Sequence, residues 1–154
     1  MSRIQLALNV SDLEASVAFY STLFGTGPHK RRNGYANFAV ENPPLKLVLI
    51  EVDSVARGTG PAGALNHLGV EVFSVADVAE AAGRLSGAGQ ATVDEADTTC
   101  CYALQDKVWT HDPAGTPWEV YVIKDDNPAS LQSANSSPCG CHGELGATTV
   151  AECC

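Results

Sequence analysis

The first 99 residues contain no cysteine, although the chain of 154 residues has six. Disulfide bonds therefore do not hold this segment together, and its fold must depend on a hydrophobic core. A chain of this length buries roughly 70% of the surface that it exposes when unfolded. The six cysteines form three close pairs near the middle and end of the sequence: Cys100 and Cys101, Cys139 and Cys141, Cys153 and Cys154.

Long apolar runs and basic residues are also scarce. No run approaches the about 18 apolar residues that span a bilayer, and MSRIQLALNV lacks the apolar segment of a signal peptide. Nine Lys and Arg face eighteen Asp and Glu, a net charge of -9 that disfavours nucleic acids and anionic membranes as partners. We therefore expect a cytoplasmic monomer or homodimer with small ligands. In that reducing compartment, cysteines more often bind metals or react than form structural disulfides.

One alternating pattern occurs twice in the sequence. QLALNV at residues 5–10 and HLGVEV at residues 67–72 match at a separation of 67 − 5 = 62 positions. Alternation of apolar with small or polar residues is typical of a half-buried strand. An approximate two-fold axis between two such strands would bring Gln5 and His67 face to face.

Each of these strands precedes a helical pattern and then more strands. The first helix should begin at Ser11 or Asp12 and end at Gly25; the second should begin near Ser74 and end near Gly87. We expect two βαβββ modules, about residues 1–55 and 64–124, in one α+β domain spanning residues 1–124 whose curved mixed sheet surrounds a cavity. The predicted apolar stripes are Leu13, Val17, Tyr20 and Phe24, and Val75, Val78, Ala82 and Leu85.

The last part of the chain, residues 125–154, is rich in Ser, Ala, Gly and Pro. We expect a flexible tail there. Two roles remain open for its thiols: capture or transfer of thiophilic metals, or none. These accessory cysteines are Cys139, Cys141, Cys153 and Cys154.

A metal site is the sharpest hypothesis for the inward polar residues. Gln5, His67 and Glu119 would supply an amide oxygen, an imidazole nitrogen and a carboxylate, a set that suits Fe(II) and also Ni, Co, Mn or Zn. Aligning the last strands matches Glu119 with Lys46, which cannot ligate while protonated, so the site would stay open. The ordinary alternative is a hydrogen-bonded structural histidine with solvated Gln and Glu. Three other residues are weaker ligand candidates: Glu51, His29 and His111.

The adjacent thiols suggest a second, softer site. Neighbouring residues in a strand point to opposite faces, so Cys100 and Cys101 can hold one atom together only where the chain turns. The polar segment DEADTTCC favours a loop at this point. Paired thiolates prefer thiophilic centres such as trivalent arsenic or Cd(II). The alternative is two ordinary cysteines, because unoxidised cysteine usually behaves as a small core residue.

The segments QLALNVSDLEASVAFYSTLFG, GYANFAV, LNHLGVEV, DTTCCYALQDKVW and PWEVY resemble the vicinal oxygen chelate superfamily. Within it they resemble carbon-arsenic lyases and the related cadmium-induced proteins. The resemblance implies an Fe(II) site at Gln5, His67 and Glu119 and arsenic binding at Cys100 and Cys101. It also implies O2-dependent demethylation of trivalent organoarsenicals, methylarsenite and reduced aromatic arsenicals among them, with no catalytic residue beyond the metal ligands.

Two other functions remain open at this stage. The chain could sequester cadmium or arsenic without catalysis, which needs the thiols alone. It could instead be another chelate-superfamily enzyme, such as a glyoxalase, which needs the metal alone. Four aromatic residues either line the cavity or belong to the core: Tyr35, Phe38, Tyr102 and Trp109.

Overall fold

A computed structural model describes residues 2–100, 102–113 and 115–128. Its strands form an eight-stranded sheet in the order β2-β3-β4-β1-β5-β8-β7-β6. The elements are β1 (Arg3–Val10), α1 (Leu13–Phe24), β2 (Lys30–Arg32), β3 (Tyr35–Val40), β4 (Leu45–Glu51), α2 (Ser54–Arg57), β5 (Leu65–Glu71), α3 (Val75–Gly87), β6 (Val93–Cys100), β7 (Ala103–His111) and β8 (Pro117–Asp125).

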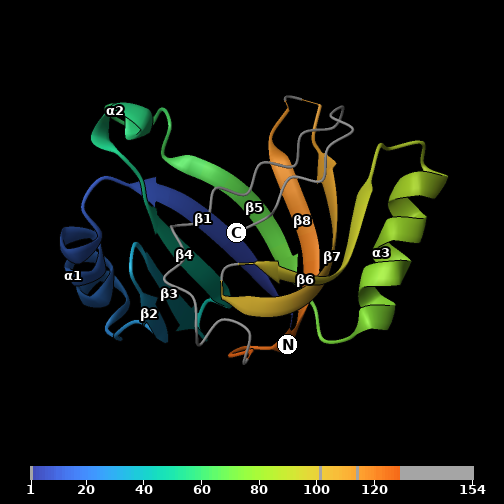
Figure 1. Cartoon of the computed structure of the whole chain (residues 1–154), viewed down its shortest axis with the longest axis horizontal. Helices are drawn as coiled ribbons and strands as arrows, with labels where there is room; N and C mark the ends of the chain where they lie inside the picture. Colours follow the sequence, from blue (N-terminus) through green and yellow to red (C-terminus); the bar gives the residue numbers. More distant parts are fainter. Residues whose placement is uncertain (1, 101, 114, 129–154) are drawn as a thin grey trace.

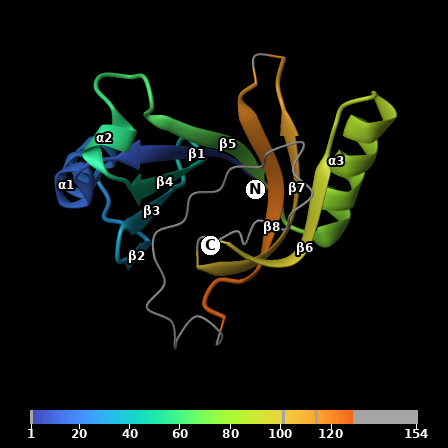
Figure 2. The ribbon, with the colours of Figure 1, turned by 45° about the horizontal axis from the view of Figure 1, so that its top comes forward.

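The α+β architecture predicted from the repeat is confirmed. Strand, helix and three further strands occur twice, as β1-α1-β2-β3-β4 and β5-α3-β6-β7-β8. The antiparallel pair β1 and β5 joins the modules, while β4 and β8 run parallel to their modules' first strands. Figures 1 and 2 show α1 and α3 outside the curved sheet, at opposite ends. No helix of the described residues has the length and apolar character needed to traverse a bilayer.

Helix α1 begins and ends where the sequence predicted. The Asp12 carboxylate accepts a hydrogen bond from the Ala15 backbone N–H, and Gly25 ends the helix at φ 66°. An aspartate cap satisfies an otherwise unpaired helix N–H, and glycine adopts the left-handed conformation without strain. The predicted stripe of this helix packs on the convex face of the first module, where Phe38 is fully buried. Phe38 is thus a core residue and does not face the concave side.

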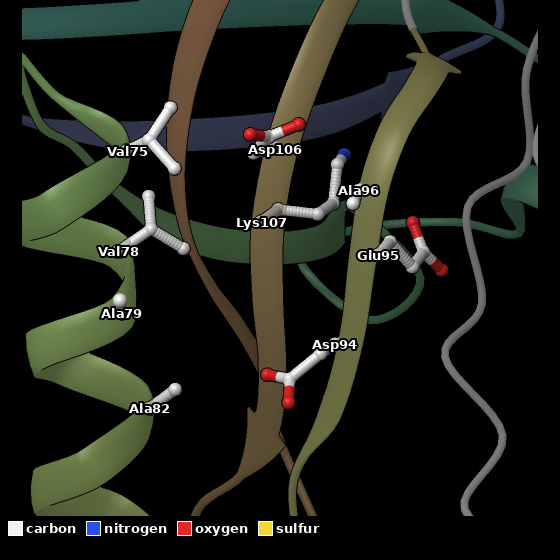
Figure 3. A pocket seen from close by; sticks show the side chains of 9 residues that line it. All are labelled: Val75, Val78, Ala79, Ala82, Asp94, Glu95, Ala96, Asp106 and Lys107. Atoms are coloured by element: carbon white, nitrogen blue, oxygen red, sulfur yellow. The ribbon is translucent and has the colours of Figure 1, made fainter.

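Helix α3 is capped by a reciprocal pair, Ser74 and Asp77. Val78 of the predicted stripe packs against Val108 and Val122, but Val75 is 51% exposed. The reason is an open cleft of about 370 Å³ between α3 and the edge of the sheet. Figure 3 shows Val75 and Val78 pointing from the helix towards this cleft, while Glu95 of β6 points away from the helix.

The predicted loop around DEADTTCC is wrong, because β6 covers Val93–Cys100. This strand is an edge strand that pairs with β7 alone, and edges accommodate polar side chains. Its register shifts between Glu95 and Thr98, where Asp97 has φ 52° and its backbone N–H donates to Asp106 (2.7 Å). Cys100, the last residue of β6, pairs with Ala103, the first residue of β7.

Candidate metal and thiol site

The residues of the predicted metal site lie on the three central strands. Gln5 of β1 pairs with Gly69 of β5, and Gly69 pairs with Glu119 of β8. His67 precedes Gly69 by two positions, so both residues share one face of the strand. The side chains of Gln5, His67 and Glu119 are all buried, with at most 4% of each residue exposed.

These three side chains are in mutual contact. Gln5 Nε2 lies 3.0 Å from His67 Nε2 and 2.7 Å from Glu119 Oε1. His67 Nε2 lies 3.3 Å from the same carboxylate oxygen. The structure therefore brings together atoms from residues 5, 67 and 119.

Gly69 permits this close approach. A Cβ at this position would lie 3.0 Å from Cγ of Glu119 and 3.4 Å from Cβ of Gln5. Any side chain there would push the two flanking strands' residues apart. The sequence carries a signal for this close packing. Gly69 occupies an inward position of HLGVEV, and an inward glycine in a strand marks a close approach of neighbouring groups.

A chain of amides orients the imidazole of His67. Its Nδ1 lies 2.7 Å from Asn66 Oδ1, while Asn66 Nδ2 donates to Asn9 Oδ1 (2.9 Å). Because Asn66 Oδ1 can only accept, the ring proton belongs on Nδ1 and the lone pair of Nε2 faces Gln5 and Glu119. The edge-to-face ring of Trp109, 5.3 Å away between centroids, packs against the imidazole.

The carboxylate of Glu119 is kept ionised in spite of its burial. Burial by itself raises the pKa of Glu119, but the Lys107 ammonium at 2.8 Å is the main opposing influence, and this pKa is lowered to about 2. Lys107 is itself buried, with its Nζ 5.3 Å from the Trp109 ring centroid. Glu119 is therefore an ionised carboxylate at neutral pH, paired with the Lys107 ammonium.

The donor set fits a divalent cation, provided that the Gln5 amide turns. Ligand atoms about 2.1 Å from an ion and at right angles to one another are about 3 Å apart, which matches the three separations here. Half a turn of the amide would place Oε1 of Gln5 beside His67 and Glu119. No group of three His, Cys, Asp or Glu residues suited to a metal occurs in the described part of the chain. Metal binding here thus depends on Gln5.

The sheet register corrects the predicted match of Glu119 with Lys46. The local two-fold axis relates Gln5 to His67 and therefore Ala7 to Gly69. Ala7 pairs with Val48, as Gly69 pairs with Glu119, so Val48 is the equivalent of Glu119. An aliphatic side chain has no ligand atom, and the fourth symmetric position remains without one.

A second polar row lies behind Gln5 and was missed by the sequence analysis. The Tyr121 hydroxyl is 2.5 Å from Gln5 Oε1 and 2.9 Å from Glu71 Oε2. Arg3 (2.9 Å) and Lys46 (3.1 Å) form salt bridges with Glu71. Burial and then Glu71 raise the pKa of Tyr121 well above its usual value, while the two cations overcome burial to lower that of Glu71. The hydroxyl therefore stays protonated beside an ionised carboxylate.

Cys100 lies on the same face as the candidate metal site. Its partner Ala103 lies on the same face of β7 as Gln105, Lys107 and Trp109, because these residues occupy every second position. Trp109 in turn pairs with Glu119. Residues paired across strands share a face. Charge on Cys100 is also among the causes that raise the pKa of Glu119, so the two side chains are close enough to interact. Cys100 is 1% exposed, and Cys101 lies outside the described residues.

The tip of the β6-β7 hairpin is tied to the first module. The buried Lys30 ammonium donates to the Tyr102 carbonyl (3.2 Å) and pairs with Asp126 (2.7 Å). The Tyr102 ring packs against Tyr35 at 5.4 Å between centroids. These contacts hold the segment that carries Cys100 across the concave face.

The weaker ligand candidates are placed away from the three central residues. Glu51 accepts a hydrogen bond from the Leu13 N–H at the start of α1, and His29 is exposed. His111 is the last residue of β7 and is partly buried. The four tail thiols lie outside the described residues: Cys139, Cys141, Cys153 and Cys154.

Comparison with known families identifies this architecture. Residues 3–120 match the model of the Glyoxalase/Bleomycin resistance protein/Dioxygenase superfamily. The chain belongs to this superfamily. A trivalent organoarsenical cleaving enzyme from Thermomonospora curvata is 57% identical over 157 residues, with all of both chains covered. The cadmium-induced protein CadI of Mycobacterium tuberculosis is 57% identical over 127 residues, covering 82% of this chain and 80% of CadI.

Solved structures share the fold at low identity. An extradiol ring-cleaving dioxygenase from B. fuscum superposes with a TM-score of 0.54 at 24% identity, covering 79% of this chain and 32% of that enzyme. At this identity the likeness concerns the fold alone.

Proposed function

We propose that this superfamily member cleaves the carbon-arsenic bond of trivalent organoarsenicals, such as methylarsenite and reduced aromatic arsenicals, with Fe(II) and O2. The observation that carries the proposal is the contact of Gln5, His67 and Glu119 on the face that also bears Cys100. The relative from T. curvata, named a trivalent organoarsenical cleaving enzyme, supports the substrate class.

The thiols bind the substrate in this proposal. Cys100 and Cys101 each lose a proton to a hydroxyl group on arsenic, two As–S bonds replace two As–O bonds, and two waters leave. Arsenic stays trivalent, and the organic group remains attached. Because Cys100 and Glu119 share a face, the carbon-arsenic bond would be held near the metal ligands, which converts a collision into an intramolecular step.

Gln5, His67 and Glu119 would hold Fe(II), which supplies one-electron chemistry with O2 when it is bound. Lys107 keeps Glu119 ionised, Asn66 accepts a hydrogen bond from Nδ1 of His67 and so orients its ring, and Trp109 shields the imidazole from water. One methylarsenous acid and one O2 together contain the atoms of one formaldehyde and one arsenous acid. The methyl carbon is then oxidised, O2 is reduced, and no further electron donor is needed.

The test combines anaerobic Fe(II) loading with methylarsenite and then O2. We expect arsenite only when both iron and O2 are present, in equal amounts to the O2 consumed. His67→Ala should abolish turnover while arsenical binding persists, and Cys100→Ser should weaken arsenical binding while Fe(II) binding persists. Arsenite release without iron would contradict the proposal.

The same variants separate the two other functions. A sequestration protein would protect cells from arsenicals equally well with Glu119→Ala, but not with Cys100→Ser. A glyoxalase would convert carbon substrates even with Ser at position 100. The cadmium-induced relatives make the first of these comparisons worthwhile, because their name records induction by a thiophilic metal.

A further inference from the structure

The Tyr121 hydroxyl lies between two oxygens that compete for its single hydrogen. Gln5 Oε1 is 2.5 Å away and Glu71 Oε2 is 2.9 Å away. A phenol donates one hydrogen bond and can accept others, so it serves only one of these oxygens as a donor at a time. Tyr121 is buried, which leaves these neighbours to satisfy it.

The Gln5 amide likewise has two possible orientations, because its oxygen and its nitrogen can exchange places. Its Nε2 is directed at two acceptors, His67 Nε2 and Glu119 Oε1, and its Oε1 is directed at Tyr121. Metal binding needs the opposite orientation, with Oε1 beside His67 and Glu119 and with Nε2 beside Tyr121. In that orientation the hydroxyl oxygen must accept a hydrogen bond from Gln5, and the hydroxyl hydrogen needs another acceptor.

Glu71 is fixed as this second acceptor. Arg3 holds its Oε1 at 2.9 Å, and Lys46 holds its Oε2 at 3.1 Å, on the side where Tyr121 also lies. An ionised carboxylate can only accept hydrogen bonds. We propose that Glu71, acting through the Tyr121 hydroxyl, is a positioning residue that turns the Gln5 amide oxygen towards the metal. The inference rests on the proposed metal site at Gln5, His67 and Glu119.

In this arrangement the Gln5 side-chain amide has two orientations, one without a metal and one with it. Without a metal, the amide N–H groups serve His67 and Glu119. With a metal, the ion satisfies those two residues, and the amide N–H groups turn to Tyr121, whose hydroxyl keeps its hydrogen and donates a hydrogen bond to Glu71. An uncharged amide at position 71 can donate to Tyr121 and so removes the preference for the ligating orientation.

The test is the effect of Glu71→Gln on Fe(II) affinity in three backgrounds, measured anaerobically by competition with a coloured chelator. Loss of an outer-shell partner typically lowers metal affinity 10–100-fold, and we expect about 10-fold for Glu71→Gln alone. In a Gln5→His background there is no amide to orient, and in a Tyr121→Phe background there is no hydroxyl to relay the effect. There the loss should be less than about 3-fold.

The two backgrounds also remove a competing explanation. Loss of a negative charge near the site weakens cation binding in all three proteins to a similar degree. A loss confined to the protein that keeps both Gln5 and Tyr121 supports the positioning role, and an equal loss in all three overturns it. If Glu71→Gln does not fold, NMR of the wild type replaces it: Zn(II) should bring the Gln5 side-chain N–H protons close to the Tyr121 ring, and unchanged proximity overturns the role.

His67→Ala separates this inference from the proposed function. If His67→Ala binds Fe(II) as tightly as the wild type, the metal site and the positioning role both fail. If His67→Ala binds weakly but Glu71→Gln shows no dependence on Gln5 and Tyr121, the positioning role alone fails.

Discussion

Glu119 shows how one residue links the stability of the protein to its chemistry. A carboxylate this deeply buried is tolerated only with compensating charge, and Lys107 supplies it at 2.8 Å. The same charge that stabilises the folded protein would attract a cation. A metal ion bound to Glu119 would therefore take over part of the charge compensation that Lys107 provides in the metal-free protein.

Acid unfolding of the metal-free protein should depend on the ionised carboxylate of Glu119. The pKa of Glu119 is lowered from 4.5 to about 2, so the carboxylate adds stability above about pH 4.5, and this stability is lost as the pH falls to about 2. Glu119→Gln should lower the free energy of unfolding by roughly 3 kcal/mol at pH 7. The difference from the wild type should shrink towards pH 2, as urea unfolding at a series of pH values would measure.

A matched control for this prediction is Glu80→Gln. Glu80 pairs with Arg84 on the surface, with 71% of its side chain exposed, and such pairs contribute little. A difference between wild type and Glu119→Gln that stays constant from pH 7 to pH 2 would contradict the assignment.

The second residue-scale prediction concerns Gly69. A methyl group there would be only 3.0 Å from Cγ of Glu119, so Gln5 and Glu119 must separate. Gly69→Ala should weaken Fe(II) binding by roughly 10–100-fold and destabilise the fold by about 1–3 kcal/mol. Chelator competition and urea unfolding measure the two effects. Gly83→Ala is the control, because nothing lies within 4 Å of its Cβ position and alanine favours a helix; unchanged Fe(II) affinity in Gly69→Ala would refute the prediction.

At the scale of elements, the β6-β7 hairpin decides where the thiol lies. Its polar edge strand carries few buried side chains, and a bulge at Asp97 redirects it. Contacts at its tip, made by Tyr102 with Tyr35 and Lys30, therefore fix its position. A hairpin anchored at its tip presents Cys100 in a defined place before any substrate arrives.

Removing that anchor should affect arsenical binding selectively. Lys30→Met keeps the length of the side chain but loses the hydrogen bonds to the Tyr102 carbonyl and Asp126. We expect affinity for phenylarsine oxide to fall roughly 3- to 10-fold, because a looser hairpin must be ordered on binding, while Fe(II) affinity is unchanged. Arg32→Met, an exposed neighbour on β2, is the control. Equal losses of arsenical and Fe(II) affinity in Lys30→Met would show that the whole fold, and not the hairpin, is affected.

At the scale of the whole molecule, the duplicated pattern made the architecture predictable. Matching QLALNV with HLGVEV predicted both modules and placed Gln5 opposite His67. The pairing of β1 with β5 is what the structure adds. Hydrophobic periodicity and helix caps are local properties, so one sequence reveals them. Glu119 could be added because its strand follows a clear turn.

Other features depend on register and three-dimensional proximity, which a single sequence does not encode locally. The true equivalent of Glu119 is Val48, two positions from the predicted Lys46, and only the pairing with Ala7 reveals it. The contact of Tyr121 with Glu71 joins strands 50 residues apart. Strand β6 was missed because its side chains are mostly polar. Polar residues are tolerated there because β6 lies at the edge of the sheet, a position that cannot be read from the sequence.

The three contacting side chains come from strands that span both halves of the chain, from residue 5 to residue 119. Neither half alone carries a complete set: the first supplies one atom, and the second supplies two. An ion bound by all three side chains would cross-link the two halves of the domain where β1 pairs with β5. Occupancy of the centre would then report that the whole domain has assembled, so an incompletely folded chain would remain unable to take up iron.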